Sequence, residues 1–194
     1  MTKTAILIDG GFYRKRAHKL WGKKSAEERA DELYRYAFRH LDKKDGPLRR
    51  NLYRILYYDC PPVQSTVYHP LLKKNIDFGK EETYAWTLDF FNALKSKRKV
   101  ALRMGKLSNV HPHYILSPEK VKKLCAGTIA VTDLTEQDFR ISFSQKGVDM
   151  RMGIDISSLA YEGIVEQIVL ISGDSDFVPA AKAARRKGID FILD

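Results

Sequence analysis

Cysteine is scarce in this 194-residue chain, which has only Cys60 and Cys125. The two lie far apart and form no CxxC pair, so the sequence indicates neither a disulfide framework nor a thiolate zinc site. No apolar run approaches the length of a membrane span, and the run before Asp9 is too short for the hydrophobic part of a signal peptide. A soluble, cytoplasmic protein is therefore expected.

Motifs for nucleoside triphosphates and dinucleotides are also absent. The chain contains no GxxxxGKS/T and no GxGxxG, so neither nucleoside triphosphate hydrolysis nor dinucleotide binding is favoured. His111 and His113 lack cysteine or carboxylate partners at zinc-ligand spacing, which predicts a solvated loop. No repeat or linker divides the chain, so residues 1–194 are predicted to form a single domain. The chain stops directly after its last predicted strand, which is compatible with a further C-terminal tail.

Acidic residues are outnumbered, since 34 Lys and Arg against 24 Asp and Glu give a net charge of +10. A positive exterior suits a polyanionic partner such as RNA, although many basic proteins bind nothing in particular. The basic residues expected to contact nucleic acid are Arg14, Lys15, Arg16, Arg185 and Arg186. Each basic run taken singly is also compatible with a solvated surface.

Short apolar runs alternate with helical patterns along the chain. The predicted strands are residues 4–8, 52–58, 167–171 and 189–193. The predicted helices are residues 26–41, 81–99, a segment from Val148 onward, and 177–187. Weaker patterns suggest strands at 100–104, 113–116, 128–131 and 139–143 and a short helix from Ser117-Pro118. The alternation predicts an α/β fold with a doubly wound, mainly parallel central sheet flanked by helices.

Four aspartates are placed where such a sheet would bring them together. Asp9 ends the first strand, Asp174 and Asp176 lie in SGDSDF after a later strand, and Asp149 lies in KGVD at a helix start. The carboxyl ends of adjacent parallel strands meet at a switch point, where ligands bind. Carboxylates brought close together repel and raise each other's pKa, so such a cluster favours a hard divalent cation. The pattern predicts a metal site for phosphoester chemistry.

Each acid also has a structural interpretation. Asp176 could be the N-cap of the following helix. Asp9, which precedes two glycines, could start a turn, and Asp149 could be a favourable charge at a helix start. Asp155 lies on a different face of the same helix as Asp149, which makes it a secondary candidate.

The motifs AILIDGG, QKGVDMRMGIDI and VLISGDSDFVPAAKAARRKG resemble, in this order, the NYN domain, a group of PIN-like nucleases that includes the LabA or DUF88 proteins. The resemblance implies a PIN-like Rossmannoid fold and a carboxylate cluster that binds Mg²⁺ or Mn²⁺ for RNA cleavage. The residues that it implies are Asp9, Asp149, Asp174 and Asp176 as metal-site and catalytic acids, Asp155 at a further acidic position, and Ser172 lining the site.

The chain departs from the family pattern at one place. Many NYN domains carry Asn shortly after the first Asp, whereas Gly10, Gly11 and Phe12 follow here. A substrate contact is therefore absent or replaced. Residues 59–135 contain no motif that aligns with the family.

The favoured hypothesis is a metal-dependent ribonuclease acting on single-stranded RNA. The cation would lower the pKa of a bound water, which attacks phosphorus in line, with Lys146 as a further group near the leaving 3′ oxygen and 5′-phosphate products. One alternative is a non-catalytic RNA-binding or regulatory module on the same fold, and another is a metal-dependent phosphatase of small phosphoesters. The sequence leaves open RNA or other nucleic acid, the number of metal ions, and the oligomeric state, a homodimer included.

Overall fold

A computed structural model describes residues 2–42, 50–107 and 112–194 of the chain. The chain divides into two compact units: unit 1 comprises residues 1–61, 86–106 and 146–194, and unit 2 comprises residues 62–85 and 107–145. The single domain expected over residues 1–194 stays a prediction. His111, part of the predicted solvated loop, lies outside the described residues.

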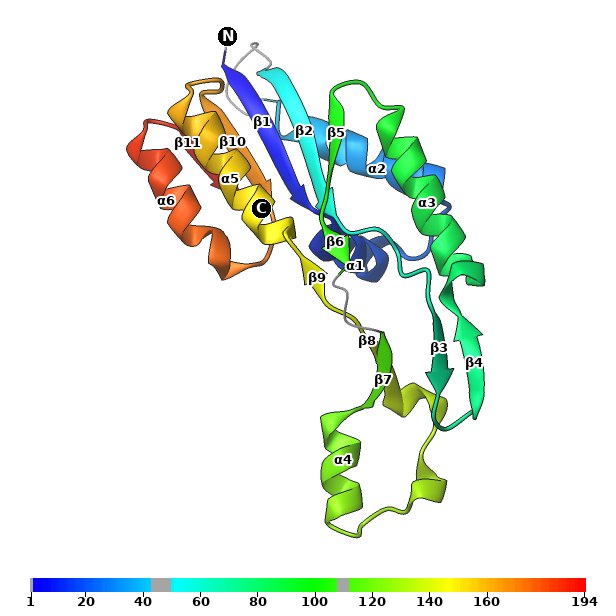
Figure 1. The fold of residues 1–194 in the computed structure, drawn as a ribbon. Helices are drawn as coiled ribbons and strands as arrows, with labels where there is room; N and C mark the ends of the chain where they lie inside the picture. The colour runs from blue at the N-terminus through cyan, green and yellow to red at the C-terminus, as the bar shows by residue number, and fades with distance from the viewer. Residues whose placement is uncertain (1, 43–49, 108–111) are drawn as a thin grey trace. The chain divides into compact units, whose positions relative to one another are not determined.

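Unit 1 is built on a five-stranded parallel sheet with the order β11-β10-β1-β2-β5 (Figure 1). Its strands are β1 (Lys3–Asp9), β2 (Asn51–Asp59), β5 (Val100–Met104), β10 (Gln167–Ile171) and β11 (Asp190–Leu193). Residues 4–8 are all buried, as expected for an apolar strand that is covered on both faces. The predicted α/β class with a doubly wound parallel sheet is confirmed.

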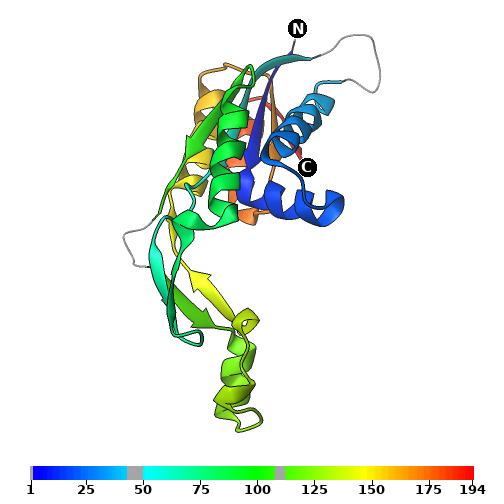
Figure 2. The ribbon, with the colours of Figure 1, turned by 90° about the vertical axis from the view of Figure 1, so that its right-hand side faces the viewer.

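Three helices cover one face of this sheet, namely α1 (Gly10–Trp21), α2 (Ala26–Arg39) and α3 (Glu82–Lys95) (Figure 2). Ile6 and Ile8 point to this face and share an apolar cluster with Leu33 and Phe90. Helix α2 begins with a reciprocal capping box at Ser25, which explains its start at Ala26. The sheet is thus closed on this side by aliphatic and aromatic side chains.

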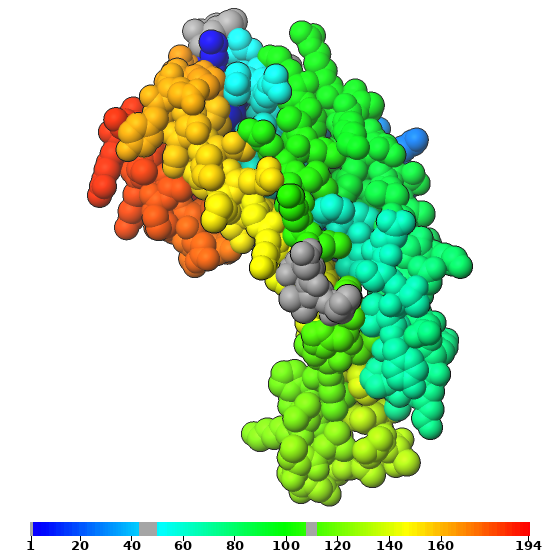
Figure 3. Space-filling view, viewed as in Figure 1, coloured from blue at the N-terminus to red at the C-terminus, as the bar shows by residue number. Residues whose placement is uncertain are grey.

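Two helices, α5 (Val148–Tyr161) and α6 (Val178–Arg186), cover the other face and close over it in the space-filling view (Figure 3). Alternation along β1 turns Ala5 and Leu7 to this side, where Met152 and Ile156 of α5 pack. The burial of both faces fixes the register of β1, because a slip of one residue would exchange the two sets of side chains.

Helix α1 was not expected from the sequence, which suggested only a turn at Asp9. Asp9 is its N-cap, and Tyr13 and Ala17 form its buried stripe. The helix starts at two glycines, which are poor helix formers. Its position directly after the central strand places its first turn beside the carboxyl end of β1.

Unit 2 consists of two antiparallel pairs and short helices. Its strands are β3 (Thr66–His69), β4 (Lys74–Asp77), β7 (His113–Leu116) and β8 (Phe139–Ser142), with β3 paired to β4 and β7 to β8. Its helices are η1 (Phe78–Lys80), α4 (Pro118–Cys125), η2 (Val131–Asp133) and η3 (Glu136–Asp138). Buried His69 lies against Tyr114 and Phe139, with ring centroids 4.2 and 5.2 Å away, and forms a small aromatic centre.

Most segments with weak sequence patterns form the predicted strand or helix. The strands at 100–104 and 113–116 and the helix from Ser117-Pro118 are confirmed, and 139–143 forms a strand that ends at Ser142. The strand expected at 128–131 is wrong, because Thr128 bonds to Lys123 behind α4 and a 3-10 turn begins at Val131. The helix expected over 81–99 ends at Lys95, before Lys99 adopts a positive φ of 65°.

The chain passes between the units at four places, two of which fall within the short strands β6 (Lys106–Leu107) and β9 (Gln145–Lys146). Within the described residues, no helix is both long enough and apolar enough to cross a membrane.

Candidate functional site

The candidate site lies at the carboxyl edge of the sheet, between β1 and β10. These strands pair in parallel with Ile8 opposite Ile171, so Asp9 and Ser172 leave the sheet side by side. From β1 the sheet continues through β2 and β5 on one side and through β10 and β11 on the other. The strand order therefore reverses at this place, where open α/β sheets bind their ligands. The predicted adjacency of the two strands is confirmed.

Buried Ser172 connects the two acidic segments. Its Oγ donates to Oδ2 of Asp9 at 3.3 Å and accepts from the backbone N–H of Asp174 at 3.2 Å. Neither Asp9 nor Asp174 forms a salt bridge with Lys or Arg in the described part of the chain. The carboxylates of the two segments are thus held near each other without a protein cation between them.

Both acids also cap the turns that follow them. Oδ1 of Asp9 accepts from the Phe12 N–H at 3.0 Å, and Oδ1 of Asp174 accepts from the Asp176 N–H at 2.9 Å. Asp174, and not Asp176, is the N-cap of η4 (Ser175–Phe177), which leads into α6. The interpretation of Asp176 as the cap of the following helix is therefore wrong, and its exposed side chain remains available to a ligand.

Asp149 brings a third segment to the site. It lies in the first turn of α5, after Gly147, which adopts a positive φ of 83° that glycine accommodates without strain. Partial burial raises the pKa of Asp149, and the charges of Asp174, Asp9 and Asp176 raise it further. The charges of the other three acids, which come from two other parts of the chain, therefore act on Asp149.

The cluster matches a divalent cation in its negative charge and in its oxygen donor atoms. Carboxylate oxygens are the ligands that Mg²⁺ and Mn²⁺ take, and the mutual repulsion seen at Asp149 is what a cation would relieve. In the side-chain arrangement described, however, no group of three or more His, Cys, Asp or Glu residues is gathered closely enough to hold a metal ion. The capping bonds of Asp9 and Asp174 account for part of this, because they direct one oxygen of each carboxylate at its own backbone.

A fifth acid, Asp59, was not expected at the site. It ends β2, is buried, and accepts hydrogen bonds from Tyr57 Oη at 3.0 Å and from the Cys60 N–H at 2.8 Å. Arg14 pairs with it at 2.9 Å. Burial raises the pKa of Asp59, Arg14 opposes that rise, and the charge of Asp9 adds to it. The sequence signal was Asp59 at the end of a strand, as for Asp9, but no family motif includes it.

The other predicted residues take separate places. Asp155 accepts from Tyr58 Oη at 2.7 Å and is held bidentately by Arg103, with both contacts at 2.9 Å. It is therefore committed to an ion pair and contributes no charge to the pKa shift of Asp149. Lys146, in β9, is exposed.

The predicted basic residues also differ from one another. Arg14 is committed to Asp59, whereas Lys15 and Arg16 on α1 are exposed. Arg185 and Arg186 are exposed in the last turn of α6, about 12 Å along the helix axis from its start near the acidic turn. Among the exposed cations of this set, Lys15 and Arg16 are the closest along their own helix to an acid of the site.

Comparison with protein-family models agrees with the sequence resemblance. The sequence model described as the NYN domain matches residues 92–193, which is more than half of the chain. A solved structure of a protein of unknown function from Vibrio parahaemolyticus is similar at 12% identity and a TM-score of 0.45, covering 99% of this chain and 80% of that chain. No curated protein matches the chain. The chain belongs to the NYN domain family, whose members are PIN-like proteins generally acting as nucleases.

Proposed function

We propose that this protein is a metal-dependent nuclease that hydrolyses phosphodiester bonds in single-stranded RNA. The observation that supports it best is the electrostatic coupling of Asp149 to Asp9, Asp174 and Asp176 at the switch point of an NYN-family sheet. Three distant segments bring negative charge to one place without a lysine or arginine partner among the described residues. The proximity of these like charges opposes folding, although Asp9 and Asp174 also cap the turns that follow them.

The residues of the site would have three separate roles: holding the metal, positioning an acid and attracting phosphate. Asp9, Asp149, Asp174 and Asp176 would hold one or two Mg²⁺ or Mn²⁺ ions, and a bound cation supplies Lewis-acid activation of water and of the phosphoryl group. Ser172 is a positioning residue, since its hydroxyl fixes Asp9 relative to the Asp174 turn. Exposed Lys15 and Arg16 would attract the phosphate backbone toward this edge of the sheet.

The decisive assay follows cleavage of a 5′-labelled single-stranded RNA with Mg²⁺ or Mn²⁺ and with EDTA, using wild type and Asp174→Asn. Asn caps a helix start about as well as Asp, so the substitution removes charge while it preserves the turn. We expect the variant to lose activity by on the order of 100-fold or more. Asp89→Asn, an exposed acid on α3, is the matched control and should cleave like wild type. Equal activity in Asp174→Asn and wild type would exclude the proposed site.

A second candidate is an RNA-binding module without catalysis. It is favoured by the capping bonds of Asp9 and Asp174 and by the lack of a three-ligand group among the described residues. It predicts salt-sensitive RNA binding that is the same in wild type and Asp174→Asn, and no cleavage with either metal. The same assay, with a binding measurement in EDTA, separates the two functions.

A further inference from the structure

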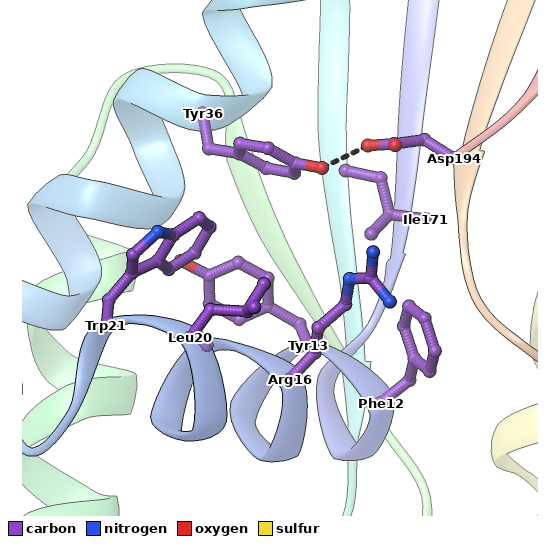
Figure 4. Close-up of a pocket in the computed structure, with 9 residues that line it drawn as sticks. Phe12, Tyr13, Arg16, Leu20, Trp21, Tyr36, Ile171 and Asp194 are labelled. Carbon is purple, nitrogen blue, oxygen red and sulfur yellow. Dashed lines mark hydrogen bonds between the residues drawn. The ribbon is translucent and has the colours of Figure 1, made fainter.

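A pocket of about 200 Å³ lies in unit 1 on the side of the sheet that α1 and α2 cover (Figure 4). Most of its wall comes from α1, and the rest comes from Tyr36 of α2, Ile171 at the end of β10, and Asp194. The α1 residues are Phe12, Tyr13, Arg16, Ala17, Leu20 and Trp21. The lining is therefore aromatic and aliphatic with one cationic and one anionic side chain.

The aromatic rings form a connected wall with exposed surface. Trp21 meets Tyr36 edge-on at 6.0 Å between ring centroids, and Tyr13 lies 6.2 Å from Tyr36. Trp21 and Leu20 keep 41% and 56% of their surface exposed, although both are large and apolar. An exposed indole and an exposed leucine beside a hollow indicate a binding surface more than a packing defect.

Arg16 and Asp194 supply the polar groups of the pocket. The Arg16 guanidinium lies 5.9 Å from the Phe12 ring centroid and points into the space between Phe12 and Tyr36 (Figure 4). Tyr36 Oη donates to Oδ2 of Asp194, which holds the phenol in place at the rim. The pocket thus offers flat apolar surface with a cation beside it.

Phe12 is a wall shared by the pocket and the acidic site. Its backbone N–H binds Asp9 at 3.0 Å, and its ring packs on Gly173 so closely that a Cβ there would come within 2.6 Å. Gly173 lies between Ser172 and Asp174, so the ring separates the pocket from the acidic turn by one side chain. A strand whose phosphate reaches the acids could therefore place a neighbouring base in the pocket.

We propose that this pocket receives one unstacked nucleobase of a single-stranded nucleic acid, held against Trp21 and Tyr36, with Arg16 beside the adjacent phosphate. The volume suits a single ring system, since pockets for drug-sized ligands occupy roughly 300–1,000 Å³. Base stacking on aromatic side chains tolerates all four bases, and arginine adds a cation-π or phosphate contact. The proposal rests on the proposed function for the identity of the ligand as nucleic acid.

The test uses Trp21 as its own reporter. The chain has two tryptophans, and Trp86→Phe leaves Trp21 as the single indole. A short RNA strand is titrated in EDTA, which prevents metal-dependent cleavage, against an abasic strand of equal length and a nucleoside monophosphate. We expect the base-bearing strand to quench Trp21 and the abasic strand to leave it unquenched. Equal quenching by both, or none by either, would overturn the proposal. Quenching by the monophosphate at the same concentration as the strand would assign the pocket to free nucleotides instead.

Binding by variants provides the second measurement. Loss of a stacked base costs about 1–3 kcal/mol, so Trp21→Ala should weaken binding roughly 5- to 150-fold. Trp21→Phe, which keeps a ring, should lose less, and Leu88→Ala, an exposed apolar truncation on α3, should bind like wild type. Circular dichroism melting checks that each variant is folded. Unchanged affinity of a folded Trp21→Ala protein would reject the pocket.

The two proposals fail in distinguishable ways. If the base-bearing strand quenches Trp21 but no RNA is cleaved with Mg²⁺ or Mn²⁺, the pocket proposal is supported and the nuclease proposal is rejected. If RNA is cleaved and Asp174→Asn is inactive, but Trp21 responds equally to the abasic strand, the nuclease proposal is supported and the pocket proposal is rejected.

Discussion

Gly10 and Gly11 are adjacent in sequence but have different surroundings. A Cβ on Gly10 would lie 2.4 Å from Tyr57 Oη and 2.5 Å from Oδ2 of Asp59, both in the interior, whereas a Cβ on Gly11 would meet only Oδ1 of Asp9 at 3.4 Å. Gly10→Ala should therefore destabilise the protein by about 1–3 kcal/mol through overpacking. Gly11→Ala should be neutral or stabilising by up to about 1 kcal/mol, because alanine favours the helix. Urea unfolding of both variants measures the difference, and equal stability of the two would contradict the packing described for Gly10.

The raised pKa of Asp149 makes stability depend on pH. The folded pKa lies above the ordinary value of 3.8, so the native state binds this proton more tightly than the unfolded chain. The associated stability is fully present below the unfolded pKa and is lost as pH rises through the folded pKa. Asp149→Asn should accordingly have a higher Tm than wild type at pH 7, with the gap closing toward pH 3. The exposed control Asp89→Asn should show no such trend, and a variant less stable than wild type at pH 7 would refute the assigned repulsion.

A divalent cation should reverse that ranking. A ligand that binds only the native state stabilises it by about 2.7 kcal/mol at 100 times its Kd. Mg²⁺ or Mn²⁺ should therefore raise the Tm of wild type more than the Tm of Asp149→Asn, which lacks one of the proposed oxygen donors. Differential scanning fluorimetry over a metal titration is sufficient, and an equal rise in both proteins would remove Asp149 from the metal set.

At the scale of elements, α1 connects the parts of unit 1 that matter for function. Its first turn is capped by Asp9, and Arg14 in its second turn pairs with Asp59. The side of the helix that includes buried Tyr13 and Ala17 lines the aromatic pocket. Breaking the Arg14 contact leaves buried Asp59 with fewer partners and should loosen the helix at β2. Arg14→Gln should lower the free energy of unfolding by roughly 1.5–3 kcal/mol, the range for hydrogen bonds to charged groups.

Lys15 provides the matched control for that prediction. Lys15 is the next residue along α1 and is exposed. Lys15→Gln should therefore change the free energy of unfolding by less than about 0.5 kcal/mol. Chemical denaturation of both variants compares them directly. If Arg14→Gln were as stable as Lys15→Gln, the ion pair would have no role in positioning α1.

Strands β1 and β10 could be predicted because they are buried on both faces. Residues 4–8 and 167–171 are continuous apolar runs, a pattern that only a covered strand or a buried helix produces, and their length favours the strand. Helix α1 could not be predicted with the same rule, because it opens with two glycines and buries only a narrow stripe. The available signal was local: Asp9 as N-cap, followed by Tyr13 and Ala17 four residues apart.

Unit 2 could be predicted only in part, because β7, β8 and α4 were expected from the sequence whereas β3 and β4 were not. Strands β3 and β4 are four residues long and expose two of those residues each, so they carry little apolar signal. The hairpin of β3 and β4 turns at Lys73, which has a positive φ of 50° although it is not glycine. Long-range contacts around His69 decide this conformation, and a local pattern does not contain them.

The acids of the candidate site could be predicted, but their bonding could not. Asp9, Asp149 and Asp174 follow from strand ends and a helix start, which depend on periodicity alone. Which acid caps which turn depends on backbone geometry, so Asp174 and not Asp176 became the cap. Asp59 was missed because its importance comes from Arg14 and Tyr57, which reach it only in the folded chain.

At the scale of the whole molecule, charge is divided unequally between the two units. Unit 2 contains seven of the 34 Lys and Arg residues and seven of the 24 Asp and Glu residues, so the net charge of +10 belongs to unit 1. Unit 1 therefore carries the long-range attraction for a polyanion, although it also contains the acidic site. The neutral composition of unit 2 gives no electrostatic reason for it to bind RNA by itself.

This division predicts which lysines set the salt dependence of RNA binding. Each phosphate neutralised on a single strand contributes about 0.7 to the slope of log K against log salt. Lys15→Ala with Lys19→Ala, both on the exposed side of α1, should reduce the slope by up to about 1.4. Lys74→Ala with Lys122→Ala removes the same charge from exposed positions of unit 2 and should leave the slope unchanged. Fluorescence anisotropy of a labelled RNA at several salt concentrations in EDTA gives both slopes. An equal reduction in the two variants would mean that the RNA contacts unit 2 as well, because only bound phosphates release counterions.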